Sequence, residues 1–302
     1  MISRVLLKGG LGNQLFQFSY LHYFKRTPGD AISFVSDNSA RLDRPFELAE
    51  LVDICPHGEP SAGYKLDIGT GDWSGFKYLL ARVFHRALGS LNKSKMELHE
   101  RSQYKFSRPK FADFVNGNGI VIGYFQNWKY PELIWDQLFP EFQSILSLVE
   151  SRNLNLSSMK SMTILHIRGG DFISESETVG VLDHNYYLRA LVRLGVKESD
   201  FSNILVLTDD LVHAKKILFL MGMPSLRLID PAQMSGWEAL FVMANSQNLI
   251  CANSTLSWWG GFIAGKHGAQ VIAPSPWNKD TNIHSSSGLL YPMFTQLDSS
   301  FI

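Results

Sequence analysis

Ile164-Leu165-His166-Ile167-Arg168-Gly169-Gly170-Asp171 is the stretch that most directly indicates the fold of this chain. The apolar run from Met162 to Leu165 predicts a strand, which then ends in a histidine, an arginine, two glycines and an aspartate. In open α/β sheets, ligands bind beyond the carboxyl ends of the strands. The segment therefore predicts a site where Arg168 binds an anion and the glycines let a ligand approach the backbone. The alternative is a plain surface turn, since a glycine pair after a strand is common.

A glycine-rich segment near the start of the chain has a similar form. A strand is expected at Val5 to Lys8, then Gly9-Gly10-Leu11-Gly12-Asn13-Gln14, then a helix from Leu15 to Phe24. Glycines permit a tight turn, and the backbone N–H groups at a helix start attract phosphate. The segment lacks both the third glycine of a dinucleotide fingerprint and the Gly-Lys-Ser/Thr of a P-loop. The segment is therefore a candidate anion-binding site, but it is neither a dinucleotide fingerprint nor a P-loop.

A third segment of this kind is Leu249-Ile250-Cys251-Ala252-Asn253-Ser254-Thr255-Leu256-Ser257-Trp258-Trp259-Gly260-Gly261. An apolar strand again gives way to small hydroxyl residues and then to a helix. Ser254 or Thr255 can cap that helix, which is the plainer interpretation. The same hydroxyls and N–H groups can instead bind a phosphate.

The order of elements predicts a parallel α/β fold. Strand-like runs occur at 5–8, 32–36, 120–125, 162–167, 204–208, 226–229, 249–252 and 270–273, and the later ones alternate with helical patterns near 185–194, 211–221, 236–246 and 255–267. Strands that alternate with helices are typical of parallel sheets. We expect two facing, doubly wound domains with a cleft between them, residues 1–152 and 153–302, joined by a polar linker at 153–158.

Composition limits the class of protein. The chain has 302 residues, 45% hydrophobic and 19% charged, with a formal net charge of zero, which is typical of a soluble globular protein and argues against nucleic acid as a partner. No apolar run reaches the roughly 18 residues that span a bilayer, and Met1 leads directly into a strand instead of a signal peptide. The two cysteines, Cys55 and Cys251, lack metal-ligand spacing. Reduced thiols, and with them a cytoplasmic location, are expected.

The balanced charge hides a basic insertion at residues 74–112, which carries nine Lys/Arg and two Glu. Within it, residues 76–88 combine helical apolar spacing with Lys77, Arg82 and Arg86. A basic amphipathic helix can lie on an anionic membrane surface, so peripheral contact with the inner face of the cytoplasmic membrane is one expectation. An ordinary domain helix with a solvated basic face is the other.

Taken in chain order, Gly9 to Gln14, His166 to Asp171, Thr208-Asp209-Asp210 and Asn253 to Trp259 resemble the bacterial α-1,2-fucosyltransferases of glycosyltransferase family 11. The resemblance runs from about Val5 to Trp277. It implies a GT-B arrangement of two Rossmann-like domains, with the GDP-sugar bound by the C-terminal domain and the acceptor on the N-terminal side. The chain departs from the family pattern at Gly169, where a second arginine is usual, and at Ala239, where a second acid usually follows Glu238. Fold and nucleotide class follow from the resemblance more directly than the sugar.

The resemblance implies inverting transfer of L-fucose from GDP-fucose to a terminal β-galactoside. No Asp-x-Asp occurs in the chain, so we expect no metal and no cofactor. Arg168 is expected on the diphosphate, because a guanidinium fork matches phosphate oxygens. The other residues expected to bind the nucleotide sugar are Gly10, Gly12, Asn13, Gln14, His166, Asp209, Glu238, Asn253, Ser254 and Thr255, with His166 and Asp209 toward the nucleoside.

The acceptor hydroxyl must lose a proton, and Asp171 is the first candidate for the base, with Glu175 and Glu177 as alternatives. Asp171 can instead hold Arg168 in place. Trp258 and Trp259 are expected in the core, whereas three other tryptophans are candidate sugar contacts: Trp73, Trp128 and Trp277.

Three other functions remain open from sequence. The same fold can use another GDP-deoxysugar such as GDP-colitose. A nucleotide-dependent oxidoreductase on a Rossmann scaffold is disfavoured by the incomplete glycine fingerprint. A non-catalytic glycan-binding protein would bind galactosides equally well with and without GDP.

Overall fold

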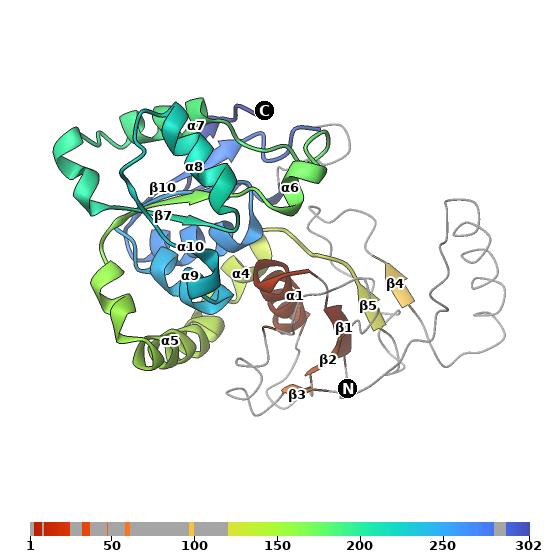
Figure 1. Ribbon diagram of the computed structural model, residues 1–302. Helices are drawn as coiled ribbons and strands as arrows, with labels where there is room; N and C mark the ends of the chain where they lie inside the picture. The colour runs from red at the N-terminus through yellow and green to blue at the C-terminus, as the bar shows by residue number, and fades with distance from the viewer. Residues whose placement is uncertain are drawn as a thin grey trace. The chain divides into compact units, whose positions relative to one another are not determined.

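The computed structural model describes residues 3–7, 9–24, 32–36, 47, 58–60, 97–99, 120–280 and 288–302. The chain divides into two compact units, residues 1–141 and 142–302 (Figure 1). The sequence-based boundary at 152/153 falls at the end of α5 (Trp135–Arg152), the helix that runs across this division. The facing arrangement of two domains stays a prediction.

The second unit contains a sheet of six strands in the order β11-β10-β9-β6-β7-β8. Every neighbouring pair is parallel. The strands are β6 (Thr163–Ile167), β7 (Ile204–Thr208), β8 (Arg227–Leu228), β9 (Asn248–Ile250), β10 (Gln270–Ser275) and β11 (Thr295–Asp298). All residues of β6 and β7 are buried, as expected for parallel strands covered on both faces. Since β6 lies between β7 and β9, the chain order reverses beside β6, which is where ligands bind in such sheets.

Helices cover both faces of this sheet. Figure 1 shows α7 (His184–Arg193) and α8 (Leu211–Leu220) on one face, and α9 (Gly236–Ala244) and α10 (Thr255–Lys266) on the other. Side chains of Asp183, Asp210 and Ser235 cap the starts of α7, α8 and α9. Shorter elements are α6 (Asp171–Ser174) and the 3₁₀ helices η2 (Leu154–Met159), η3 (Glu198–Asn203) and η4 (Pro231–Gln233).

Two tyrosines of α7 tie the helix to the sheet. The Tyr186 hydroxyl donates to the carbonyl oxygen of Cys251 at 2.8 Å, and the Tyr187 hydroxyl donates to that of His166 at 3.2 Å. Both rings are buried, so each hydroxyl satisfies a backbone acceptor that water does not reach. The Cys251 carbonyl directly follows β9, and the His166 carbonyl lies within β6. These are the two strands at which the chain order reverses.

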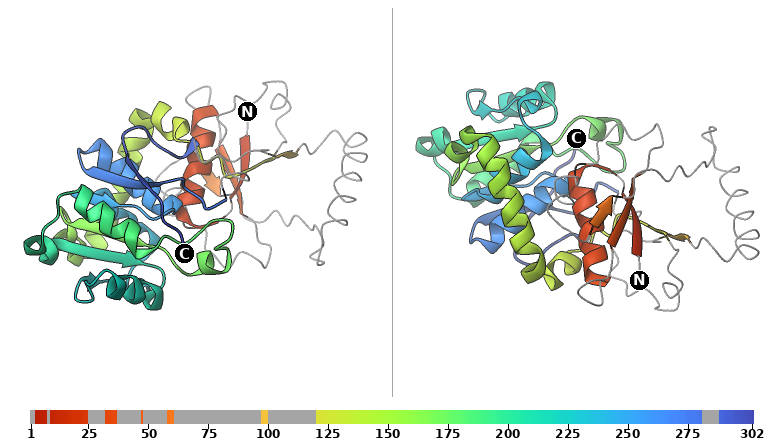
Figure 2. Two further views of the ribbon diagram at one scale, coloured as in Figure 1. Left: turned by 90° about the horizontal axis from the view of Figure 1, so that it is seen from above. Right: turned by 90° about the horizontal axis from the view of Figure 1, so that it is seen from below.

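The first unit contains a parallel sheet in the order β3-β2-β1-β5-β4. Its strands are β1 (Ser3–Leu7), β2 (Ile32–Ser36), β3 (Gly58–Pro60), β4 (Glu97–His99) and β5 (Ile120–Ile122). Both views of Figure 2 show α1 (Leu11–Phe24) alongside β1, and α1 also packs against α4 (Lys129–Leu133). The ring of Tyr20 stacks on that of Phe125 with centroids 3.7 Å apart.

The expectation of an α/β fold with doubly wound parallel sheets is confirmed, and the strands expected at 32–36 and 204–208 match residue for residue. Within the polar stretch expected as a linker at 153–158, residues 154–158 lie in η2, and the Asn153 side chain caps its first turn. Three strands were missed because they lack apolar runs: β3, β4 and β11. The helix expected at 76–88 lies outside the described residues. Among those that are described, no helix combines the length and apolarity needed to cross a membrane.

Two glycines let α10 pack closely. A Cβ on Gly260 would lie 2.5 Å from the Met243 Cβ of α9, and one on Gly261 would lie 2.8 Å from Val271 Cγ1 of β10. A Cβ on Gly265, in the same helix, would be 3.8 Å from Val271, an ordinary contact. The spacing of α10 from α9 therefore depends on Gly260.

We predict that Gly260→Ala lowers the free energy of unfolding by about 1–3 kcal/mol, because the added methyl overpacks the contact with α9. Gly265→Ala is the matched control in the same helix. It should be neutral or stabilising by up to about 1 kcal/mol, because alanine favours helix where there is room. Urea unfolding of both variants measures the difference, and equal midpoints would contradict the packing argument.

Candidate functional site

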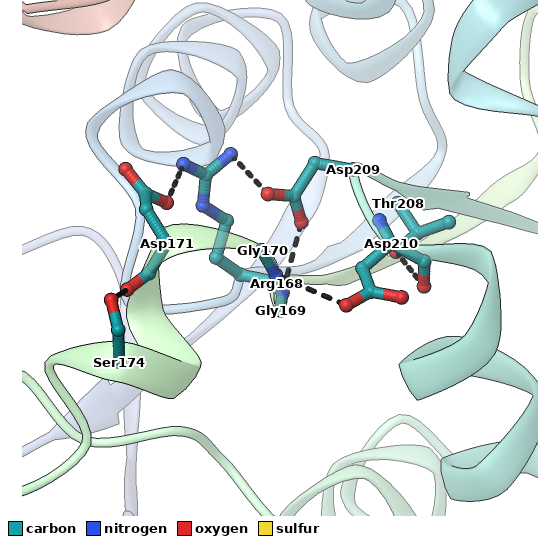
Figure 3. A network of polar contacts seen from close by, with 8 residues as sticks. All are labelled: Arg168, Gly169, Gly170, Asp171, Ser174, Thr208, Asp209 and Asp210. Carbon is teal, nitrogen blue, oxygen red and sulfur yellow. Dashed lines mark hydrogen bonds and ion pairs between the residues drawn. The ribbon is translucent and has the colours of Figure 1, made fainter.

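The candidate site lies at the carboxyl edge of the second unit's sheet. Arg168 directly follows β6, Asp209 and Asp210 follow β7, and Asn253 and Ser254 come shortly after β9. Because β6 is paired with both β7 and β9, the ends of the three strands meet at one edge. Figure 3 shows the polar network that joins the end of β6 to the end of β7.

Arg168 is held between two carboxylates. Its Nη2 lies 2.5 Å from Asp171 Oδ1, and its Nη1 lies 2.8 Å from Asp209 Oδ2 (Figure 3). The arginine side chain is 14% exposed, against 51% for Asp171 and 27% for Asp209. Arg168 Nε is buried and has no hydrogen-bond partner among the described residues. A guanidinium that keeps an unsatisfied buried donor is suited to bind an oxyanion.

The two glycines after Arg168 let the end of β7 approach closely. Gly169 N donates to Asp209 Oδ1 at 2.9 Å, and Gly170 N donates to Asp210 Oδ2 at 3.3 Å. Gly170 has φ +49°, and a Cβ there would collide with the Asp209 carboxylate. The contacts with Asp209 and Asp210 therefore require glycine at both 169 and 170, so this segment is more than a surface turn.

Gly169 is one of the two positions where the chain departs from the pattern that the resemblance implies, which has a second arginine there. A Cβ there would lie 2.9 Å from Asp210 Cβ and 3.0 Å from His213 Cβ, both at the start of α8. Any side chain at 169 would therefore displace the start of this helix. In this chain, glycine at 169 thus allows the segment after β6 to pack closely against the start of α8.

Asp171 begins the short helix α6 and contacts Arg168 directly, as the second expectation for this residue requires. A role as general base stays a prediction. Glu175 and Glu177 are exposed on the following loop, and Glu177 Oε1 lies 3.4 Å from Lys279 Nζ.

His166 lies inside β6 and is buried. Burial, with a smaller contribution from the positive charge of Arg168, lowers the pKa of His166 to about 3. Its Nδ1 has no hydrogen-bond partner among the described residues. The imidazole is therefore neutral at ordinary pH and keeps an unsatisfied polar atom, while its expected contact with a nucleoside stays a prediction.

The residues after β9 contact the loop that contains Val179 and Gly180, and they lead into the start of α10. Asn253 Nδ2 donates to the carbonyl oxygens of Val179 and Gly180, at 3.1 and 3.0 Å. Ser254 occupies the N-cap position, but its hydroxyl makes no capping hydrogen bond, contrary to the plain capping interpretation. The N-terminus of α10, which includes Thr255, therefore lacks a cap from this hydroxyl. Phosphate binding by Ser254 and Thr255 stays a prediction.

Glu238 forms a capping box at the start of α9. Its Oε2 accepts from Ser235 N at 2.7 Å and its Oε1 accepts from Asn153 Nδ2 at 2.8 Å. Burial opposes ionisation, but the hydrogen bonds from Asn153 and Ser235 outweigh it and lower the pKa of Glu238. The carboxylate thus has a structural role in capping α9, and its contact with a nucleotide stays a prediction.

In the first unit, the glycine-rich segment is placed differently from expectation. Helix α1 begins at Leu11, so Gly12, Asn13 and Gln14 lie in its first turn and only Gly9 and Gly10 precede it. The reason is that the N–H groups of Asn13 and Gln14 both donate to Gly10 O, at 2.9 and 3.1 Å, which closes the first turn. The Asn13 side chain also accepts from Gln126 Nε2 at 2.7 Å.

The tryptophans divide clearly. Trp258 and Trp259 are fully buried, which confirms their place in the core. Trp277 is also buried, so it offers no open face to a sugar in this structure, contrary to its candidacy. Trp128 is half-buried, and Trp73 lies outside the described residues.

Sequence reasoning missed Asp210, His213 and the contact of Asp209 with Arg168, while the expected contact of Asp209 with the nucleoside stays a prediction. The available signal was Thr208-Asp209-Asp210 at the end of the strand that follows β6, because sequential strands in such sheets are often neighbours. In the part of the chain that the structure describes, no group of three or more His, Cys, Asp or Glu could hold a metal ion.

Comparison with known proteins identifies the class to which this fold and site belong. The model of glycosyl transferase family 11 matches residues 96–287, more than half of the chain. The chain belongs to this family.

Two curated relatives are from Escherichia coli. The chain is 28% identical to the O-antigen biosynthesis glycosyltransferase WbnK over 91% of this chain and 95% of that protein. It is 25% identical to an alpha-1,2-colitosyltransferase over 92% of this chain and 93% of that protein.

Two solved structures with lower similarity were also found. The E. coli heptosyltransferase WaaC with ADP matches with a TM-score of 0.46 and 13% identity, over 91% of this chain and 87% of that one. The NodZ alpha-1,6-fucosyltransferase with GDP matches with a TM-score of 0.41 and 14% identity, over 87% and 93%.

We predict that His166 makes folding stability depend on pH. Its pKa in the folded state is about 3, below the ordinary value of 6.5, so unfolding takes up a proton between these two values. The free energy of unfolding should therefore fall as the pH is lowered from about 6.5, by up to about 1.4 kcal/mol per pH unit from this residue. His213, whose pKa is lowered by burial, adds to the same trend.

Chemical denaturation at several pH values between 6.5 and 5 measures this slope. His166→Gln should flatten it, because the variant has no imidazole at this buried position. An unaltered slope in His166→Gln would show that the buried neutral imidazole is not its source.

Proposed function

We propose that this glycosyltransferase moves L-fucose from GDP-fucose to the 2-hydroxyl of a terminal β-galactoside, as a galactoside 2-α-L-fucosyltransferase. The observation that carries the proposal is Arg168, which is nearly buried at the sheet edge and keeps an unsatisfied Nε. A guanidinium in this place suits a leaving diphosphate, whose negative charge grows as the glycosidic bond breaks. The relative that acts in O-antigen biosynthesis supports a bacterial surface glycan as the acceptor.

In the proposed reaction, the acceptor oxygen attacks C1 of the sugar from the face opposite the diphosphate. The bond between C1 and the phosphate oxygen breaks, GDP leaves with the bonding electron pair, and the hydroxyl proton passes to Asp171. Attack from the opposite face inverts the configuration at C1. Fixed donors take the part that a metal plays elsewhere: Arg168, the N-terminus of α10, and the hydroxyls of Ser254 and Thr255.

GDP-colitose is a second candidate donor, because one relative is an alpha-1,2-colitosyltransferase. Colitose is fucose without the 3-hydroxyl, so the pocket around C3 decides between the two sugars. A site that hydrogen-bonds a hydroxyl strongly rejects an analogue that lacks it, whereas an apolar pocket excludes an added hydroxyl only weakly. Family membership argues against both an NAD-dependent oxidoreductase and a glycan-binding protein without catalytic activity.

The proposal includes a cytoplasmic location, because the described cysteine, Cys251, is a free buried thiol. Peripheral contact with the membrane through residues 74–112 depends on a segment that is mostly outside the described residues. Sedimentation with anionic liposomes at low and high salt tests this part separately.

We predict transfer to lactose or N-acetyllactosamine from GDP-fucose in excess EDTA, because no step requires a metal. Parallel reactions with GDP-fucose and GDP-colitose, followed by mass spectrometry, give the donor preference. A fucose-specific site should favour GDP-fucose by about a thousandfold or more if it hydrogen-bonds the 3-hydroxyl. A preference for GDP-colitose would show that the donor is GDP-colitose instead of GDP-fucose. Loss of activity in EDTA that Mn²⁺ restores would show that the reaction depends on a metal.

We predict that Asp171→Asn slows transfer by about a hundredfold or more, because the amide keeps the shape of the side chain but cannot take the proton. GDP affinity, measured by calorimetry, should stay within about threefold, a change of less than 1 kcal/mol. Glu177→Gln, on the same loop, is the matched control and should keep normal rates.

The two variants also separate the alternatives. A joint collapse of GDP affinity and rate in Asp171→Asn would make the residue a holder of Arg168. Loss of rate in Glu177→Gln alone would move the base to Glu177.

A further inference from the structure

Asp209 uses its two carboxylate oxygens on two different partners. Oδ2 lies 2.8 Å from Arg168 Nη1, and Oδ1 accepts from Gly169 N at 2.9 Å (Figure 3). The guanidinium and the backbone of the residue that follows it are thus bound by one side chain from the neighbouring strand. This arrangement holds the guanidinium of Arg168 and the peptide group that follows Arg168.

We propose that Asp209 is a positioning residue that holds Arg168 in the orientation that binds the diphosphate, and that Asp209 does not itself bind the nucleotide. The inference rests on the proposed function to the extent that Arg168 meets a diphosphate. It replaces the expected contact of Asp209 with the nucleoside.

Hydrogen bonds hold the backbone on the C-terminal side of Asp209. Thr208 Oγ1 accepts from Asp210 N at 3.0 Å. Asp210 Oδ1 accepts from His213 N at 3.0 Å and caps α8, while its Oδ2 receives Gly170 N. Asp209 therefore stands between a fully buried strand and a capped helix, and a residue anchored on both sides loses little conformational entropy when it orients another.

Asp171, the second carboxylate on Arg168, has a different character. Its side chain is 51% exposed, against 27% for Asp209, and it lies on the four-residue helix α6. Two carboxylates on one guanidinium leave the group with a net negative charge, which repels a diphosphate. Asp171 is the partner that an incoming phosphate can displace, because Asp209 remains tied to Gly169 through its other oxygen.

Asparagine cannot reproduce the role of Asp209. Its single carbonyl oxygen can face either Arg168 or Gly169, and its amide group then presents a donor to the other donor. Asp209→Asn should therefore weaken GDP binding about tenfold to a hundredfold, as expected for the loss of a hydrogen bond to a charged group. Removal of the negative charge of Asp209 also favours binding of the anionic GDP. This gain in affinity is smaller than the loss, because solvent screens a partly exposed charge.

A double-mutant cycle in GDP affinity separates positioning from direct contact. Calorimetry is run on the wild type, Asp209→Asn, Arg168→Ala and the double variant, over concentrations that cover the weaker binding. If Asp209 acts through Arg168, its substitution in the Arg168→Ala background should leave GDP affinity unchanged or raise it. If Asp209 contacts the nucleotide directly, the same loss of affinity will appear in both backgrounds, and the proposal is wrong.

Asp200→Asn is the control for a general loss of charge or stability. Asp200 also accepts a backbone N–H, from Lys197 at 2.9 Å, but it precedes β7 and so lies at the opposite edge of the sheet. It should leave GDP affinity within about twofold, well under the effect of losing a charged hydrogen bond. Thermal melts of both variants then show whether weaker binding in Asp209→Asn merely follows loss of folding.

A readout without nucleotide keeps the inference separate from the proposed function. In Asp209→Ala, hydrogen exchange of the Gly169 amide should speed up by about tenfold or more, because its acceptor is gone. The Gly222 amide, which donates to Phe219 O at 3.0 Å, should not change. If the wild type fails to bind GDP, the proposed function fails while this result still tests the contact. An unchanged Gly169 amide would overturn the positioning role.

Discussion

The register of β6 against β7 is the constraint on which the candidate site depends. Ile167 lies opposite Thr208 in this parallel pair, so the next residues of both strands, Arg168 and Asp209, leave the sheet side by side. A shift of one residue would exchange the two faces of the strand and separate the arginine from its carboxylate. Both strands are buried over their whole length, so this register lies in the core, and the ion pair forms where it brings the two strand ends together.

The same edge of the sheet is supported from within the core. Tyr186 and Tyr187 bind carbonyl oxygens next to β9 and within β6, so α7 holds both strands that flank the reversal of chain order. On the other face, Gly260 and Gly261 bring α10 close to α9 and β10. The polar groups of the site therefore rest on a densely packed scaffold, which is what precise placement of an anion-binding arginine requires.

Charge in this region is controlled by burial and by pairing. His166 is neutral because it is buried beside Arg168, which removes a second positive charge from the strand end. The guanidinium then carries the positive charge of the network, and the two carboxylates of Asp209 and Asp171 pair with it and exceed it by one negative charge. One of these carboxylates is anchored and the other is exposed. A guanidinium whose exposed carboxylate partner can be replaced by a phosphate is paired both with and without ligand. An unpaired buried charge would instead lower the free energy of unfolding.

The sequence by itself determined the class of the fold and the place of the arginine. Apolar runs bounded by polar residues located β2 and β7 at their observed ends, and the alternation with helices predicted parallel sheets, because these patterns reflect local periodicity. Strands without such runs, β3, β4 and β11, could not be found in this way. The first turn of α1 was also misplaced, since Gly12 lies within it and hid the helix start at Leu11.

Only the tertiary structure decided the partners of the site residues. The contact of Arg168 with Asp209 joins positions far apart in the chain, and strand pairing creates it, so no local pattern specifies it. The same holds for the close approach of Gly169 to the start of α8 and for the burial of Trp277. Local sequence sets which residues end a strand, while packing between distant segments sets what those residues touch.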